Sequence, residues 1–202
     1  MTEAPTLVLA STSAARRQLL AAAGVPHEAM APAVDEESAK AALRADGVDP
    51  RGLADALAEL KATKLSGKLG PALVLGCDQV LETADGATLD KPGSRDEAED
   101  QLRSLRGQTH RLISAAVICE HGRPVWRAVE VASLSVRPFS DAFLVEYLDH
   151  EWPAIGGCVG GYRFEGRGVQ LFGRVAGSHA AILGLPLLPL LAYLRERGVI
   201  AA

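Results

Sequence analysis

Residues 9–20 read LASTSAARRQLL and predict a β-strand that passes directly into an α-helix. The apolar run Leu7–Ala10 is typical of a buried strand, and the Ser13 hydroxyl is a favourable N-cap for the helix that follows. Such a junction presents free backbone N–H groups and the positive end of the helix dipole. Ser11 and Ser13 add hydroxyl donors, and Arg16 adds a planar guanidinium that suits phosphate oxygens. The stretch therefore predicts either a phosphate site or an ordinary strand–helix junction with solvated arginines.

The composition is that of a globular protein, with 48% hydrophobic and 23% charged residues. A formal net charge of −4 disfavours a general nucleic-acid binder, because such proteins carry a basic surface. The first residues lack the positive segment of a signal peptide, and the apolar run Ile182–Leu194 is too short to span a bilayer. The three cysteines are widely spaced and show no zinc-ligand pattern. We expect a cytoplasmic protein with reduced thiols and with neither a membrane nor a nucleic-acid partner.

Strand and helix patterns alternate along the chain and predict one α/β domain over residues 1–202. The expected strands are residues 7–10, 32–37, 72–75, 109–120, 125–137 and one strand before the C-terminal helix. The expected helices begin after Ser13, Asp49, Ser94 and Ser140, and the last covers Leu187–Arg197.

The helix that begins after Asp49 carries both apolar and basic residues. Its apolar side is predicted to hold Leu53, Leu57, Leu60 and Leu65, which places Lys61 on or near the border of that side.

Three further segments could carry chemistry. Asp78 and Gln79 follow a predicted buried strand, at the end where α/β proteins bind ligands. Lys91 is fixed before a proline, and Glu165 begins a glycine-containing stretch in which backbone could approach a ligand closely. Each segment also has an ordinary explanation: an aspartate in a turn, a solvated lysine and a loosened loop.

Several common site types are absent from the sequence. The histidines show no metal-ligand spacing, and no Ser-His-Asp arrangement is evident. No segment has the spacing of a P-loop. The run GGCVGG at residues 156–161 does not lie between a first strand and its helix, as a dinucleotide fingerprint would.

Taken in order, the segments resemble the Maf family of nucleoside triphosphate pyrophosphatases over nearly the whole chain. The motifs that carry the resemblance are LAS-x-S…RR…LL at residues 9–20, VDE at 34–36, LAELKA at 57–62, GCDQV at 76–80, KP at 91–92, LRGQTH at 105–110 and LGLPL at 183–187. The resemblance implies an elongated mixed sheet flanked by helices, with two lobes and a central cleft, similar to inosine triphosphate pyrophosphatases. It also implies hydrolysis between the α and β phosphates and makes a homodimer the expected assembly.

The resemblance further implies roles for individual residues. Ser11, Ser13 and Arg16 would hold the phosphates, and Lys61 and Lys91 would offset phosphate charge. Glu36 and Asp78 would bind Mg²⁺ or Mn²⁺, and Asp78 would be the base for the attacking water. These roles suit attack on a polyanion, which needs cations around the phosphates and a carboxylate that orients water.

Two features resemble the subgroup that acts on 7-methyl-GTP. Gln79 follows the aspartate where members directed to dTTP or UTP have Thr, and Glu165-Gly166 replaces a Gln-Gly pair near the nucleobase. A carboxylate at Glu165 suits the N1–H and 2-amino edge of guanine, because it only accepts hydrogen bonds. The alternatives are an enzyme for dTTP, UTP or modified pyrimidine triphosphates, and a non-catalytic nucleotide-binding regulator of cell division.

The chain departs from the family pattern at two places. Ala14-Ala15 replaces a proline and its neighbour, which leaves open whether Arg17 contacts phosphate. The stretch Gly177–Ile182 lacks the family's Asn before its Val-Gly-Leu-Pro segment, which leaves the role of that loop open.

Overall fold

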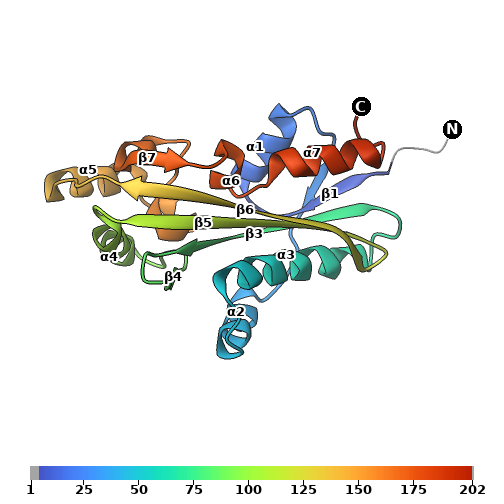
Figure 1. The fold of residues 1–202 in the computed structure, drawn as a ribbon, viewed down its shortest axis with the longest axis horizontal. Coiled ribbons are helices and arrows are strands. Elements are labelled where there is room, and N and C mark those ends of the chain that lie inside the picture. Colours follow the sequence, from blue (N-terminus) through green and yellow to red (C-terminus); the bar gives the residue numbers. More distant parts are fainter. Residues whose placement is uncertain (1–4, 202) are drawn as a thin grey trace. The chain divides into compact units, whose positions relative to one another are not determined.

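The expected alternation of strands and helices is present in a computed structural model of the chain, which describes residues 5–201 (Figure 1). The strands are β1 (Leu7–Ala10), β2 (Glu28–Met30), β3 (Leu73–Glu82), β4 (Thr88–Leu89), β5 (Thr109–Glu120), β6 (Arg123–Val136) and β7 (Phe172–Ala176). The helices are α1 (Ala14–Ala22), α2 (Glu36–Ala45), α3 (Pro50–Ser66), α4 (Arg95–Leu105), α5 (Asp141–Glu151), α6 (His179–Ile182) and α7 (Leu187–Glu196). Three 3₁₀ turns cover Ala154–Gly157, Val159–Gly161 and Arg167–Leu171.

The strands of residues 5–201 form one seven-stranded sheet, in the order β2-β1-β3-β5-β6-β7, with β4 paired to β3. The strand β1 runs parallel to β2 and β3, whereas β4 is antiparallel to β3 and β7 is antiparallel to β6. This is a mixed sheet with helices around it, as the family resemblance implied. None of the helices within residues 5–201 has the length and apolar character needed to cross a membrane.

The chain divides into two compact units, each with its own hydrophobic core. Among the described residues, unit 1 holds 5–78, 114–130 and 184–201, and unit 2 holds 79–113 and 131–183. In unit 1, apolar side chains of α1 and α7 pack on one face of β1 and β3, and α3 lies on the opposite face (Figure 1). In unit 2, side chains of α4, α5 and β6 meet in a second core. The strands β3, β5 and β6 contribute residues to both units. That residues 1–202 form one domain stays a prediction.

The contact between α3 and β3 is unusually close at Gly76. A Cβ atom added to Gly76 would lie 2.0 Å from the Ala58 carbonyl oxygen and 2.7 Å from the Ala62 backbone nitrogen. Only glycine fits there, because real Cβ atoms essentially never approach other atoms so closely. Side chains alternate between the faces of a strand, so Asp78 shares the α3 face with Gly76.

The predicted starts of several helices and of one strand are confirmed. Ser13, Asp49, Ser94 and Ser140 cap α1, α3, α4 and α5 as predicted. The strand β3 starts where expected but continues to Glu82, so Asp78 lies within it rather than after its end.

Two expectations about local structure were wrong. The strand expected at residues 32–37 is absent, because Asp35 caps α2 and Glu36 is its first residue. On α3, Leu60 is 38% exposed and Lys61 is 6% exposed. Lys61 is therefore one of the buried residues of α3 and Leu60 is not. The sequence had predicted Leu60 on the apolar side of the helix and Lys61 on or near its border. The short helix α6 was not predicted, although Ser178 before it is an N-cap residue.

Candidate active site

The junction of β1 and α1 has the hydrogen bonds of a capped helix start. The Ser13 hydroxyl accepts a hydrogen bond from the Arg16 backbone N–H at 3.4 Å. The buried Ser11 hydroxyl accepts one from the Ser13 backbone N–H at 3.2 Å. Both serines thus lie at the start of α1, where a helix presents its free N–H groups. Arg17 is exposed on the same helix.

The Arg16 guanidinium is fixed mainly by backbone carbonyl groups. Its Nε donates to the Gly184 carbonyl at 2.8 Å, and its Nη1 donates to the Cys77 carbonyl at 3.0 Å. Nη1 also lies 3.4 Å from the Ser11 hydroxyl. Three chain segments of unit 1 therefore hold one guanidinium at the start of α1. These contacts give Arg16 a structural role, and its contact with phosphate stays a prediction.

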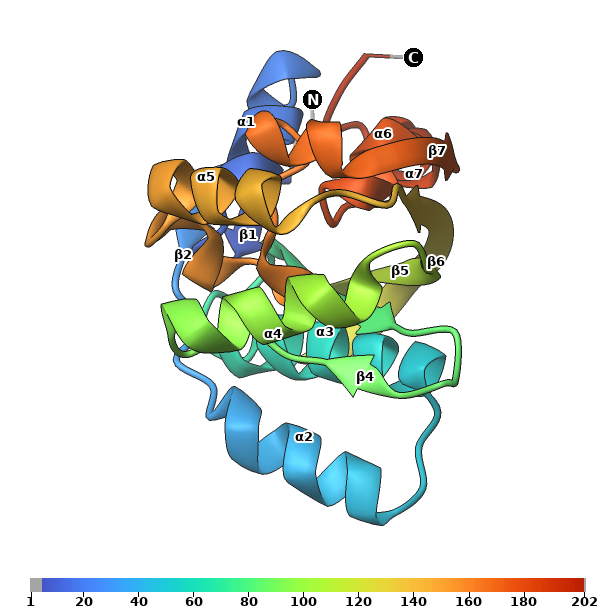
Figure 2. The ribbon, with the colours of Figure 1, turned by 90° about the vertical axis from the view of Figure 1, so that its left-hand side faces the viewer.

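The predicted residues Glu36, Lys61 and Asp78 form a charged cluster in unit 1. Lys61 Nζ lies 2.6 Å from Asp78 Oδ1 and 3.0 Å from Glu36 Oε2. Lys61 and Asp78 are only 6% and 5% exposed, whereas Glu36 is half-buried at the start of α2. The helix α2 lies beside α3 (Figure 2), so Glu36 and Lys61 come from neighbouring helices.

The second carboxylate oxygen of Asp78 is a buried acceptor. Within residues 5–201, Asp78 Oδ2 accepts no hydrogen bond. A buried carboxylate oxygen without a donor is costly, and a cation or a water proton would relieve that cost. The cluster is therefore a place where a cation and a water molecule could bind.

The neighbouring thiol of Cys77 is not a nucleophile at neutral pH. Burial raises its pKa to about 11, although the positive charges of Arg16 and Lys61 oppose that change. The protonated thiol is fully buried on β3. Catalysis by a cysteine is therefore not the chemistry of this cluster.

The other predicted site residues, Gln79, Lys91 and Glu165, belong to unit 2. The half-buried Gln79 donates hydrogen bonds through its side-chain amide to the Ala181 and Ile182 carbonyls, each at 3.0 Å. Lys91 and Glu165 are both exposed.

Lys91 and Glu165 share one neighbour, Cys158. Burial raises the pKa of the Cys158 thiol, the Glu165 carboxylate raises it further, and Arg163 and Lys91 lower it. The structure thus brings Lys91 and Glu165 into the electrostatic surroundings of the same thiol.

Sequence analysis missed the ion pair that supports the Glu165 turn. Arg163 Nε and Nη2 donate to Glu151 Oε2 at 3.1 and 2.8 Å, and Glu151 is buried. Gly168 lies against the Arg163 backbone, since a Cβ there would be 2.3 Å from the Arg163 carbonyl oxygen. The residues at 151 and 163 form no recognisable motif, so only the fold reveals their contact.

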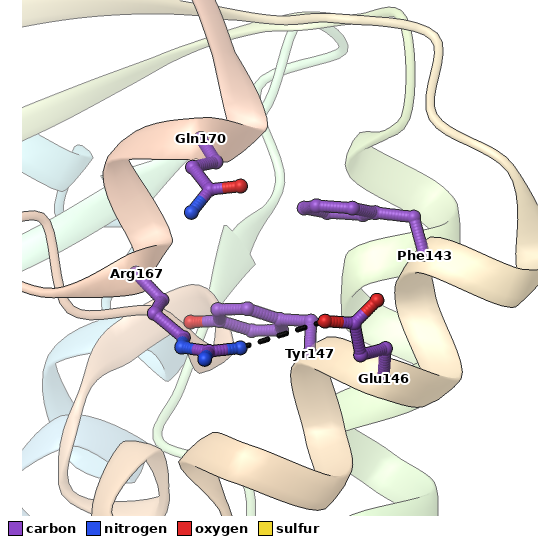
Figure 3. A pocket seen from close by; sticks show the side chains of 5 residues that line it. All are labelled: Phe143, Glu146, Tyr147, Arg167 and Gln170. Carbon is purple, nitrogen blue, oxygen red and sulfur yellow. Dashed lines mark ion pairs between the residues drawn. The ribbon is translucent and has the colours of Figure 1, made fainter.

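Unit 2 also contains a separate hollow of about 240 Å³ on α5 (Figure 3). Its lining consists of Phe143, Glu146, Tyr147, Arg167 and Gln170. Arg167 and Glu146 form an ion pair at 3.6 Å, which Figure 3 shows beside the Tyr147 ring. None of the predicted site residues lines this hollow.

Comparison with known proteins identifies the family. The family described as Maf-like protein matches residues 6–197, and the chain belongs to this family. A nucleoside triphosphate pyrophosphatase of Caulobacter vibrioides is 52% identical over 194 residues, covering 96% of both chains. Proteins of the same name from Sphingopyxis alaskensis and Ruegeria pomeroyi are 49% and 52% identical over 194 residues. Each of these two alignments covers 96% of this chain, with 98% and 97% of the respective relative.

Proposed function

We propose that this protein hydrolyses a nucleoside triphosphate between its α and β phosphates, with release of a nucleoside monophosphate and pyrophosphate. The Glu36–Lys61–Asp78 cluster carries the proposal, because it places a buried carboxylate and an ammonium group 2.6 Å apart. The relatives' shared name and their identity of about half of the residues support the same class, a hydrolase acting on acid anhydrides.

The triphosphate would bind at the start of α1. The free N–H groups there, the Ser11 and Ser13 hydroxyls and the Arg16 guanidinium all favour phosphate oxygens. Because Arg16 is already held by the Cys77 and Gly184 carbonyls, little side-chain freedom is lost when a phosphate binds. Lys91 is the other residue proposed to offset phosphate charge.

Asp78 would accept the proton of the attacking water. The water oxygen forms a bond to phosphorus, the bond from that phosphorus to the bridging oxygen breaks, and the water proton passes to the Asp78 carboxylate. The hydrogen bond from Lys61 to Oδ1 fixes the orientation of this carboxylate and leaves Oδ2 for the water. Lys61 also offsets negative charge that develops on the phosphate oxygens.

Glu36 and Asp78 would hold a divalent cation, Mg²⁺ or Mn²⁺. No group of three or more His, Cys, Asp or Glu side chains in the described chain could enclose a metal ion. Two carboxylates fit Mg²⁺ nonetheless, since this ion commonly takes one or two carboxylates together with water and substrate phosphates. When bound, the ion would supply positive charge that polarises the phosphate oxygens.

The proposed substrate is 7-methyl-GTP, and the proposed base-reading residue is Glu165. The carboxylate is exposed on a turn, so it is accessible to the donor edge of a guanine. The positive charge of the methylated ring adds an electrostatic preference for a carboxylate. The runner-up substrates are dTTP, UTP and modified pyrimidine triphosphates.

Pyrophosphate release tests both parts of the proposal. The full-length protein is incubated with Mg²⁺ or Mn²⁺ and each of 7-methyl-GTP, GTP, UTP, CTP, dTTP and 5-methyl-UTP. We expect the highest kcat/KM with 7-methyl-GTP and no turnover in the presence of a chelator. Preferred turnover of a pyrimidine triphosphate would keep the reaction and reject the substrate.

The alternative of another class is a non-catalytic nucleotide-binding regulator of cell division. Folded protein that binds nucleotide but releases no pyrophosphate from any member of the panel would favour it. The cytoplasmic location and the homodimer remain predictions.

A further inference from the structure

The short loop that carries Lys91 lies beside α4 in unit 2. The Gln101 side chain donates a hydrogen bond through Nε2 to the Asp90 carbonyl oxygen at 3.2 Å. Glu97, four residues earlier on the same helix, accepts one at Oε2 from the Gly93 backbone N–H at 2.8 Å. Residues four apart lie on one face of a helix. Two side chains of this face therefore hold the backbone on both sides of Lys91.

Pro92 restricts the backbone of this loop further. Its ring fixes its own φ and confines the residue before it, Lys91, to extended conformations. Pro92 is buried, and a Cβ on Gly156 would lie 3.6 Å from its carbonyl oxygen, so the turn Ala154–Gly157 packs against it. The Lys91 side chain is nevertheless exposed. The fold thus presents an accessible ammonium group from a restrained backbone.

The hydrogen bond of Glu97 differs from that of an ordinary capping box. In that motif, the glutamate three residues after the N-cap accepts from the N-cap backbone N–H. Ser94 is the N-cap of α4, and its hydroxyl accepts from the Glu97 N–H at 3.1 Å, as the motif requires. The Glu97 carboxylate accepts instead from Gly93, one residue nearer to Lys91 in the chain. This contact therefore supports the loop that carries Lys91.

Gln101 is buried at a cost that packing does not explain. Its side chain is 8% exposed, and its Oε1 accepts no hydrogen bond from residues 5–201. An unpaired buried amide oxygen is unfavourable, and an apolar side chain of similar size, such as methionine, would avoid that cost. The useful part of the amide is therefore Nε2, which lies 3.2 Å from the Asp90 carbonyl oxygen and 3.5 Å from Glu97 Oε1.

We propose that Gln101 and Glu97 are positioning residues that hold Lys91 in place for the phosphates of the substrate. This inference rests on the proposed function, because it assumes that the Lys91 ammonium group offsets phosphate charge. A lysine loses conformational freedom when it binds an anion, and a backbone that is fixed beforehand leaves only the side chain to be ordered. The contribution is to binding of the triphosphate and does not depend on the base.

The main test uses Gln101→Met, which keeps the approximate size of the side chain and removes the Nε2 donor. We expect faster hydrogen exchange at residues 90–93 of the ligand-free protein. The KM should rise about fivefold for every nucleotide that is hydrolysed, with kcat nearly unchanged, because the cost of ordering the loop is added to binding. Circular dichroism confirms folding. Wild-type exchange at residues 90–93, or an unchanged KM, would overturn the proposal.

Variants of Glu97 separate its hydrogen bond from its charge. Glu97→Ala removes the acceptor for the Gly93 N–H and should raise the KM in the same direction as Gln101→Met. Glu97→Gln keeps an acceptor oxygen and should restore the KM to near the wild-type value. Equal KM values in the two Glu97 variants would mean that the charge alone matters and would contradict the positioning role.

Ser104→Ala is the matched control on the same helix. Its hydroxyl donates to the Gln101 backbone carbonyl at 2.7 Å and is exposed, so the variant loses a hydrogen bond of α4 but none to the loop. Exchange at residues 90–93 and the KM should both stay at the wild-type values. A change in this control equal to that of Gln101→Met would show that any weakening of α4 has the same effect, and the specific role of the amide would be rejected.

A double variant decides whether Gln101 acts through Lys91. In the Lys91→Met background, Gln101→Met should raise the KM by less than about twofold, because both changes remove the same contribution. The same rise in both backgrounds would overturn the proposal. Failure of the proposed function has a separate signature: the wild-type protein then releases no pyrophosphate from any nucleotide, while hydrogen exchange still reports whether Gln101 and Glu97 hold the loop.

Discussion

The two groups of predicted site residues differ in how the fold supports them. In unit 1, Glu36, Lys61 and Asp78 lie on helices and a central strand, and Lys61 and Asp78 are buried and paired at 2.6 Å. In unit 2, Lys91 and Glu165 are exposed and lie outside the regular elements. Regular elements fix catalytic groups more accurately than loops do, whereas loops tolerate change. The difference suggests that the chemistry common to all triphosphates belongs to unit 1 and the choice of base belongs to unit 2.

The largest expected effect is that of Asp78→Asn. The amide cannot accept a proton from water, and we expect kcat to fall about a thousandfold for every nucleotide. Steady-state pyrophosphate release measures the change, with circular dichroism to confirm folding. Asp85→Asn, at an exposed aspartate in the β3–β4 turn, is the matched control and should behave as wild type. A loss of less than tenfold in Asp78→Asn would remove Asp78 as the base.

Gly76→Ala tests whether the close packing of unit 1 supports the cluster. The added methyl would overlap the Ala58 carbonyl at 2.0 Å, so α3 must move away from β3. We expect a loss of about 3 kcal/mol in the free energy of unfolding, measured in urea, together with reduced kcat. At Gly67 the nearest atom to a Cβ is 3.9 Å away and φ is −63°, so Gly67→Ala should change stability by less than about 1 kcal/mol. Equal stabilities of the two variants would contradict this view of the α3–β3 contact.

Lys61→Met tests the electrostatic balance of the cluster. Without the ammonium group, a buried carboxylate is left beside a second carboxylate, and we expect a loss of about 3 kcal/mol in the free energy of unfolding. Mn²⁺ should raise the thermal midpoint of this variant more than that of the wild-type protein, because the cation replaces the missing charge. Thermal unfolding with and without Mn²⁺ measures both effects. Lys64→Met, at an exposed position on the same helix, is the control. An identical Mn²⁺ response in all three proteins would argue against a cation site here.

Acid should weaken unit 2 through a group outside the site, His110. Burial lowers its pKa from 6.5 to about 4, and its Nε2 lies 2.6 Å from the Tyr162 hydroxyl. The unfolded chain takes up the proton near pH 6.5 and the folded chain only near pH 4, so stability falls as the pH decreases through this window. The full loss is about 3 kcal/mol and stops growing below pH 4.

Urea unfolding of His110→Phe between pH 4 and pH 7 measures this contribution. The variant should show a flatter pH dependence than the wild-type protein. His150→Phe, at an exposed histidine, should keep the wild-type dependence. A wild-type slope in His110→Phe would show that other groups cause the acid sensitivity.

Sequence patterns predicted the regular part of the molecule better than the environment of its charges. Hydrophobic periodicity and caps located most helices and strands, because both depend on local chemistry. The burial of Lys61 could not be predicted, since it depends on the approach of α3 to β3 at Gly76 and on the pairing with Asp78. Residues 32–37 were predicted as a short strand that runs into an acidic segment, because so short a stretch shows too little periodicity to reveal the helix that Asp35 caps and Glu36 begins.

The same limit applies to the predicted site residues. Motif order was enough to select Glu36, Lys61 and Asp78, and the structure brings these three together. It did not reveal the contacts of Gln79, which is predicted to bind substrate and whose amide donates to the Ala181 and Ile182 carbonyls at the end of α6. Long-range hydrogen bonds of this kind leave no periodic pattern in a sequence.

The smallest expected effect, Glu165→Gln, most directly tests the division between the two units. The amide keeps the shape of the carboxylate and loses the negative charge and one acceptor edge, so it fits the guanine donors and the methylated ring less well. We expect kcat/KM for 7-methyl-GTP to fall about tenfold and that for UTP to change less than twofold, as measured by pyrophosphate release. Glu146→Gln, at an exposed glutamate of α5, is the matched control and should alter neither value. An equal fall for both nucleotides would mean that Glu165 supports the common chemistry, and the assignment of base choice to unit 2 would then fail.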